Sequence, residues 1–137
     1  MKLKLSEIIE LNYEVNGASR NVDGVQEVLM HGLMKQKSSL KIKAYLQRLN
    51  KIISEEIKIY EDLKKELYLK YGKENEDGSI SLLPENIAEF QKEHDELINA
   101  EREIDVKMIW STDLTLDNLA AIETDEVYNV FLKLVDN

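Results

Sequence analysis

The sequence predicts a mainly α-helical fold: a long antiparallel helical hairpin with short flanking helices and a small two-stranded β element. Three observations predict this class. One uninterrupted amphipathic pattern covers 40–71, a second covers 85–103, and a polar turn at 72–84 separates them. Alternating polar and apolar residues at 1–5 and 103–110 favour two short strands that pair with each other.

The N-terminal part is expected to hold the first strand and two short helices. Lysine and leucine alternate along Met1–Leu5, which is typical of a half-buried strand. Ser6 is expected to cap a helix over Glu7–Val15, because its hydroxyl can accept a hydrogen bond from an unpaired first-turn amide. Glycines and polar residues at 17–24 predict a loop. The following Val25–Met34 segment predicts a short helix whose inward side chains are Val25, Val28 and Leu29, with Leu33 as a further candidate.

The long helix, from about Leu40 to Tyr71, dominates the sequence. It contains no glycine or proline, and Ser39 stands where a cap is needed. A helix of ~30 residues is ~45 Å long, so it needs a packing surface along much of that length. Its apolar residues have heptad-like spacing, with Glu56 at the one polar step. The predicted interaction seam is Leu46, Leu49, Ile53, Tyr60, Leu63 and Leu67.

The second helix, over about 85–103, is expected to fold back on the first. Pro84 suits its first turn. His94 falls on the apolar stripe, so we interpret it as a packed seam residue rather than a metal ligand. This helix is too short to cover the whole seam. The uncovered end must meet residues 7–34, the C-terminal helices or a second copy. The outer side carries a predicted acidic face of Glu89, Glu93 and Glu96.

The C-terminal region, 104–137, is expected to begin with the strand that ends at Trp110. This single tryptophan is either a core anchor or, if exposed, a contact anchor for a partner. Two short helices are predicted after it, at Asp117–Ile122 and Asp125–Val135. Residues 1–39, the hairpin at 40–103 and this region together form one expected domain of 137 residues.

The composition narrows the classes of partner. The chain carries a net charge of −9. Residues 1–73 hold 14 basic and 10 acidic side chains, whereas 74–137 hold 4 and 17. This acidic surplus disfavours DNA, RNA and anionic membranes as partners. We see neither a signal peptide nor an apolar run long enough for a membrane span, and we expect an intracellular protein.

The chemistry-bearing residues predict no enzyme. The chain has no cysteine, no nucleophile elbow and no glycine-rich phosphate loop. The loop after the long helix resembles a calcium loop only at its centre. Lys73 and Pro84 stand where the first carboxylate and the bidentate glutamate would be needed. We therefore predict no catalytic residue, no metal site and no cofactor.

Several segments together resemble a known class of protein. They are a Lys/Leu-alternating start, a long helix ending in Leu67-Tyr-Leu-Lys-Tyr-Gly72, the turn Glu76-Asp-Gly-Ser79, Glu-Phe-Gln-Lys-Glu at 89–93, and Glu96-Leu-Ile-Asn-Ala-Glu101 running into Ile104-Asp-Val. This order is similar to that of small uncharacterised proteins encoded by tailed phages and prophages of Gram-positive bacteria. The resemblance covers roughly 40–110 and implies phage biology, without an activity or a site residue to carry over.

Two functions follow as expectations. The first is a non-enzymatic phage protein that acts by protein–protein contact, as a virion component or morphogenesis helper and as a homo-oligomer. The second is an acidic inhibitor of a host nucleic-acid enzyme, of the anti-restriction or anti-CRISPR type. The partner is then either a phage virion protein or a host enzyme, and the expected location is the host cytoplasm or the virion.

Overall fold

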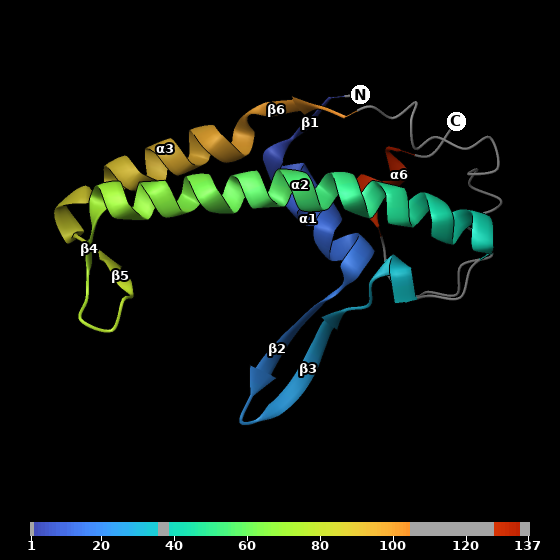
Figure 1. The fold of residues 1–137 in the computed structure, drawn as a ribbon, viewed down its shortest axis with the longest axis horizontal. Helices are drawn as coiled ribbons and strands as arrows, with labels where there is room; N and C mark the ends of the chain where they lie inside the picture. Colours follow the sequence, from blue (N-terminus) through green and yellow to red (C-terminus); the bar gives the residue numbers. More distant parts are fainter. Residues whose placement is uncertain (1, 36–38, 105–127, 135–137) are drawn as a thin grey trace.

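The fold is built around one long helix, α2, which shorter elements flank over most of its length (Figure 1). The computed structural model describes residues 2–35, 39–104 and 128–134. This part of the chain is mainly helical and contains three small two-stranded sheets. The helices are α1 (Leu5–Asn16), η1 (Leu33–Lys35), α2 (Leu40–Tyr71), η2 (Pro84–Asn86), α3 (Ile87–Asn99) and α6 (Asn129–Leu132). The strands are β1 (Lys2–Lys4), β2 (Ala18–Val22), β3 (Val25–Met30), β4 (Gly72–Glu74), β5 (Ile80–Leu82) and β6 (Glu101–Glu103).

Helix α2 has the predicted extent, and local signals set both of its ends. The Ser39 hydroxyl accepts a hydrogen bond from the backbone N–H of Ile42 at 3.3 Å. At the other end Gly72 passes close to the helix backbone and to β5. A Cβ atom there would lie 2.6 Å from the carbonyl oxygen of Tyr68 and 2.7 Å from Cγ2 of Ile80. The glycine therefore allows the chain to leave the helix and enter the β4–β5 hairpin at once.

The core lies where α1 crosses the N-terminal half of α2. Helix α1 begins at Leu5, two residues before the predicted start, and Lys4 rather than Ser6 precedes it. The Glu7 carboxylate accepts a hydrogen bond from the Lys4 backbone N–H at 3.1 Å, which serves the first turn in place of a serine cap. Side chains from both ends of the chain join this core, whose buried members are Leu3, Leu5, Ile8, Leu11, Val15, Leu33, Ile42, Tyr45, Leu46, Leu49, Ile53, Ile104, Tyr128, Val130, Phe131 and Leu134.

The prediction of a loop at 17–24 and a helix at Val25–Met34 was wrong. Residues 18–30 form the antiparallel hairpin β2–β3, in which Val22 pairs with Val25, and the helical turn η1 follows only at Leu33–Lys35. Asp23 and Gly24, with φ of 51° and 79°, make the two-residue turn that such a hairpin needs. The hairpin, called here the arm, extends away from the helices (Figure 1). Three side chains predicted to face inward are exposed, namely Val25, Val28 and Leu29, whereas the further candidate Leu33 is buried.

The base of the arm is tightly packed. Strand β2 begins directly after Gly17, β3 ends shortly before Gly32, and the backbones of the two glycines are in contact. A Cβ atom on Gly32 would lie 2.5 Å from the backbone nitrogen of Gly17. Any larger residue at Gly32 would thus push α1 and η1 apart.

The predicted pairing of the first strand with a strand beyond the second helix was right, but its position was shifted. Strand β1 pairs antiparallel with β6 at Glu101–Glu103, so Leu3 lies opposite Arg102. Helix α3 ends at Asn99 rather than Glu103, because Ala100 is extended and its carbonyl accepts a hydrogen bond from the N–H of Leu5 at 3.0 Å. The predicted strand covers 103–110, and its part from 105 to Trp110 lies outside the described residues, as does the predicted helix at Asp117–Ile122.

A buried carboxylate holds the C-terminal helix α6 against α1. Glu14 is 2% exposed, and its two oxygens accept hydrogen bonds from the backbone N–H groups of Val130 and Phe131 at 3.1 and 2.9 Å. Burial raises the pKa of Glu14, and these two hydrogen bonds lower it in part. Helix α6 lies inside the range predicted for the last helix, Asp125–Val135, of which the structure describes 128–134.

Candidate functional site

The predicted interaction seam of α2 divides into two halves with different surroundings. Leu46, Leu49 and Ile53 are fully buried against α1 and belong to the core. Tyr60, Leu63 and Leu67 are half-buried, because α1 does not reach this part of the helix, where α3 lies on the seam side and the β4–β5 hairpin on the other flank. The second half of the seam is therefore the part that solvent reaches.

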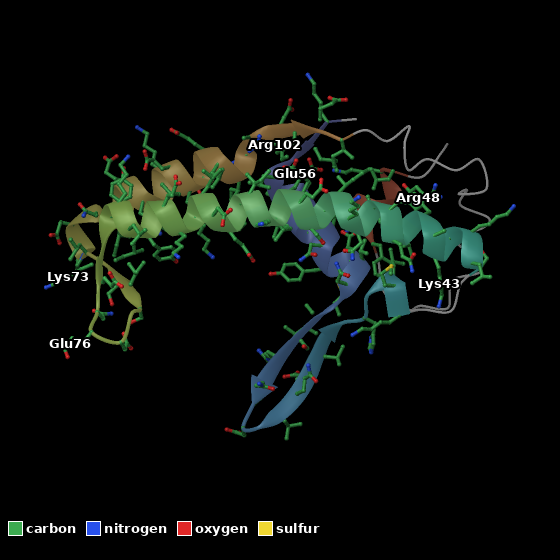
Figure 2. All side chains as sticks on the ribbon, in the orientation of Figure 1. Lys43, Arg48, Glu56, Lys73, Glu76 and Arg102 are labelled. Atoms are coloured by element: carbon green, nitrogen blue, oxygen red, sulfur yellow. The ribbon has the colours of Figure 1, made fainter. Side chains whose placement is uncertain are left out.

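The polar step of the seam, Glu56, lies at the boundary between the two halves. Its carboxylate oxygen is 3.7 Å from Nε of Arg102, which comes from β6 (Figure 2). This ion pair joins the middle of α2 to the strand that follows α3. A carboxylate in the seam is thus matched by a cation from another element, which helps to fix where α3 ends beside α2.

An open groove of about 450 Å³ lies between helices α2 and α3 beyond this ion pair. We call it the α2–α3 groove. Its apolar members are Leu63, Leu67 and Leu97, which leave part of their surface to solvent. Its charged members are Glu66, Lys70, Glu93 and Glu96. We call the three leucines the floor of the groove and the four charged residues its walls. A lining that combines apolar and charged side chains suits an amphipathic helix.

The electrostatics of the groove centre on one ion pair. Nζ of Lys70 lies 3.0 and 3.3 Å from the two carboxylate oxygens of Glu93. This contact raises the pKa of Lys70 and lowers that of Glu93, and the Tyr71 hydroxyl contributes to both shifts in the same directions. The lining carries three carboxylates and one ammonium group, so an excess of negative charge remains.

Aromatic side chains join the two helices beside the groove. The Tyr60 hydroxyl and Nε2 of His94 are 2.8 Å apart, and the Phe90 ring stacks on His94 with a centroid distance of 5.9 Å. Tyr68 completes the cluster, with its ring centroid 4.9 Å from that of Phe90. His94 thus occupies a packed position on the apolar stripe of α3, as its spacing predicted. Within the described residues, no group of three or more histidine, aspartate or glutamate side chains is placed to hold a metal ion.

The opposite flank of α2 has a different character. A second hollow of about 370 Å³ lies between α2 and the β4–β5 hairpin, and its lining includes Tyr68 and Ile80. Lys64 and Lys65 supply its positive charge, against the single carboxylate of Glu61. The polar loop considered as a calcium site forms this hairpin, with Asp77 accepting hydrogen bonds from the N–H and hydroxyl of Ser79 at 3.0 and 2.6 Å.

The groove combines residues that the sequence presented as separate features. Leu63 and Leu67 come from the predicted seam, and Glu93 and Glu96 from the predicted acidic face. Glu89 is exposed and does not line the groove, and Trp110 lies outside the described residues. Sequence reasoning missed Glu66, Lys70 and Leu97 as members of the site. The spacing could have found two of them, because Glu66 and Lys70 follow the two seam leucines by three residues.

The arm is a second exposed surface. Val25, Val28 and Leu29 are 69%, 53% and 55% exposed, and Arg20 pairs across the strands with Glu27 at 2.9 Å.

Within the described residues, no helix is both long enough and apolar enough to cross a membrane. Comparisons of the chain with protein-family models, with curated proteins and with solved structures found no match.

Proposed function

We propose that this protein is not an enzyme and acts by binding another protein, with the α2–α3 groove as the docking site for an amphipathic helix of the partner. The observation that carries this proposal is the division of the seam. Its first half is core, whereas its second half, at Leu63 and Leu67, forms a partly exposed floor beside Leu97. In this proposal α2 and α3 act as an antiparallel helical hairpin whose seam the partner completes.

The size of the groove is consistent with two turns of a partner helix. Leu63 to Lys70 covers about 10 Å of α2 at 1.5 Å per residue. Burying a whole leucine side chain contributes about 1.5–3 kcal/mol, so each half-buried leucine of the floor offers roughly 1 kcal/mol to a partner. Three such residues supply a useful apolar contact, to which the charged walls add orientation and specificity.

The biological role that we propose follows from the resemblance to phage proteins. The protein is then a virion component or a morphogenesis helper that binds a phage virion protein in the host cytoplasm or in the virion. We also propose that it forms homo-oligomers, which sedimentation of the purified protein would detect directly.

A second candidate function is inhibition of a host nucleic-acid enzyme by charge mimicry. The 17 acidic side chains of residues 74–137, against 4 basic ones, favour it. Glu93, however, is paired with Lys70, so the predicted acidic face is interrupted by a cation at its centre. For this reason the groove supports protein docking better than it supports mimicry of a phosphate backbone.

The experiment is an affinity capture from phage-infected host cells with three forms of the tagged protein: wild type, Leu63→Asp and Leu69→Asp. Leu69 is the matched control, because it is 53% exposed on the same helix and does not line the groove. We expect a virion protein to be recovered by wild type and Leu69→Asp, to be lost with Leu63→Asp, and to remain bound at high salt. Recovery of a host nuclease that is lost at high salt from all three forms would support charge mimicry instead.

A further inference from the structure

The Lys70–Glu93 ion pair lies in the lining of the groove, beside its leucines, and Lys70 is the only cation among the seven lining residues. The pair is exposed, with 59% of the Lys70 side chain and 33% of the Glu93 side chain open to solvent, so it contributes little to the stability of the free protein. Nζ of Lys70 reaches both oxygens of Glu93 and lies 5.0 Å from the centre of the Tyr71 ring.

We propose that the helix bound by the α2–α3 groove is basic. In the free protein Lys70 forms the ion pair with Glu93, and in the complex a lysine or arginine of the partner replaces Lys70 in that pair. This inference rests on the proposed function and adds the charge of the partner to it. The charge of the lining supports it, because Glu66 and Glu96 line the groove with Glu93, and Lys70 is the one cation in that lining. Lys92, which lies outside the lining, also acts on Glu93 through its charge. A helix with leucines on one side and basic residues beside them meets both the floor and the walls.

The contact geometry also explains how a partner side chain would displace Lys70 from Glu93. The two oxygens of Glu93 accept from a single ammonium group, whereas a guanidinium group donates two parallel hydrogen bonds to a carboxylate. Lys70 is exposed and its stem is flexible, so its ammonium group can swing into solvent at small cost. Lys70 therefore competes with the partner, and its removal should strengthen binding of a cationic helix.

The test uses a fluorescein-labelled designed peptide of about 18 residues, made of leucine and lysine with the leucines on one helical face. Its binding to the full-length protein is measured by fluorescence anisotropy at low and high ionic strength. Lys70→Met keeps the aliphatic stem and removes the charge. Lys65→Met is the matched control, because it changes the net charge equally on the same helix but lines the other hollow.

We expect Lys70→Met to tighten binding by about two- to fivefold at low ionic strength, the scale of one exposed ion pair. Lys65→Met should change it by less than twofold, and Glu93→Gln should weaken it. A charge-reversed peptide of leucine and glutamate should bind less tightly than the basic peptide. If Lys70→Met binds the basic peptide no more tightly than Lys65→Met, the role given to Lys70 is wrong.

Two further variants separate this outcome from failure of the groove itself. If Leu63→Asp weakens peptide binding and Leu69→Asp does not, the groove is the site, whatever the result for Lys70. If the peptide fails to bind wild type, or binds Leu63→Asp as tightly as Leu69→Asp, the docking site and the role of Lys70 are both refuted. Far-UV circular dichroism checks that each variant is folded, and Leu63→Ala replaces Leu63→Asp if that variant melts early.

Discussion

Removal of the Glu14 carboxylate should weaken the attachment of the C-terminal helix to the core. In Glu14→Ala the backbone N–H groups of Val130 and Phe131 lose their hydrogen-bond acceptor. The site is buried, because Glu14 itself is only 2% exposed. An unsatisfied buried donor costs about 1–3 kcal/mol. The variant no longer buries a carboxylate, which offsets part of that cost. We therefore expect the free energy of unfolding to fall by about 2–4 kcal/mol.

Urea unfolding followed by far-UV circular dichroism measures this loss, with Glu14→Gln as the intermediate variant. The glutamine oxygen can accept from one of the two N–H groups, so roughly half of the loss is expected. A change in Glu14→Ala below about 0.5 kcal/mol would refute the reasoning, because that is the scale of an ordinary surface substitution.

The same residue predicts a dependence on pH. Burial raises the pKa of Glu14 in the folded protein above its ordinary value of 4.5. The Glu14 carboxyl then binds its proton more tightly in the folded than in the unfolded state. Its contribution to the free energy of unfolding is therefore fully present below pH 4.5 and declines as pH rises through the pKa of the folded state. The destabilisation caused by Glu14→Gln should accordingly be larger near pH 4 than near pH 7. An equal or opposite difference would contradict this assignment.

Further predictions concern three single positions in the fold. Tyr45→Phe should leave stability unchanged or raise it by up to about 1 kcal/mol in urea unfolding, because the buried hydroxyl has no hydrogen-bond partner among the described residues. In wild type, burial raises the pKa of Tyr45 to about 12, so an ultraviolet titration should show one tyrosine that ionises late and is missing from Tyr45→Phe. Gly72→Ala should lower the thermal midpoint clearly, since its Cβ would lie 2.6 Å from the Tyr68 carbonyl oxygen. Gly24→Ala should cost only about 1 kcal/mol, because its φ of 79° is unfavourable for alanine while nothing lies within 4 Å of the added Cβ.

The elements that the sequence predicted well are those whose signals are local. Helix α2 begins after Ser39 and ends before Gly72, because a capping hydroxyl and a glycine act within one turn of the helix. The arm was missed for an equally local reason. Val25, Val28 and Leu29 have the three- and four-residue spacing of a helical stripe, and that pattern hid the Asp-Gly turn signal just before it.

The groove could be predicted only in part, because its members come together through tertiary packing. The sequence indicated an apolar seam on one helix and carboxylates on the next. It could not place Lys70 against Glu93, which is 23 residues away, since that contact depends on how far α3 extends beside α2. The end of α3 is fixed in turn by the β1–β6 pairing, which involves the first residues of the chain.

The close approach of Gly17 and Gly32 makes the arm separable from the rest of the fold. A Cβ atom on Gly17 would lie 2.9 Å from the backbone nitrogen of Gly32, so the chain almost closes on itself where the arm begins and ends. Joining these two glycines directly would delete residues 18–31 and still span the gap between α1 and η1. Such a shortened chain would keep α1, α2 and the α2–α3 groove, but it would lose the packing of Met30 against the core and the hydrogen bond from the Tyr128 hydroxyl to the His31 carbonyl. It would also shorten the loop that folding has to close. A binding activity lost by a shortened chain that still folds could then be attributed to the arm.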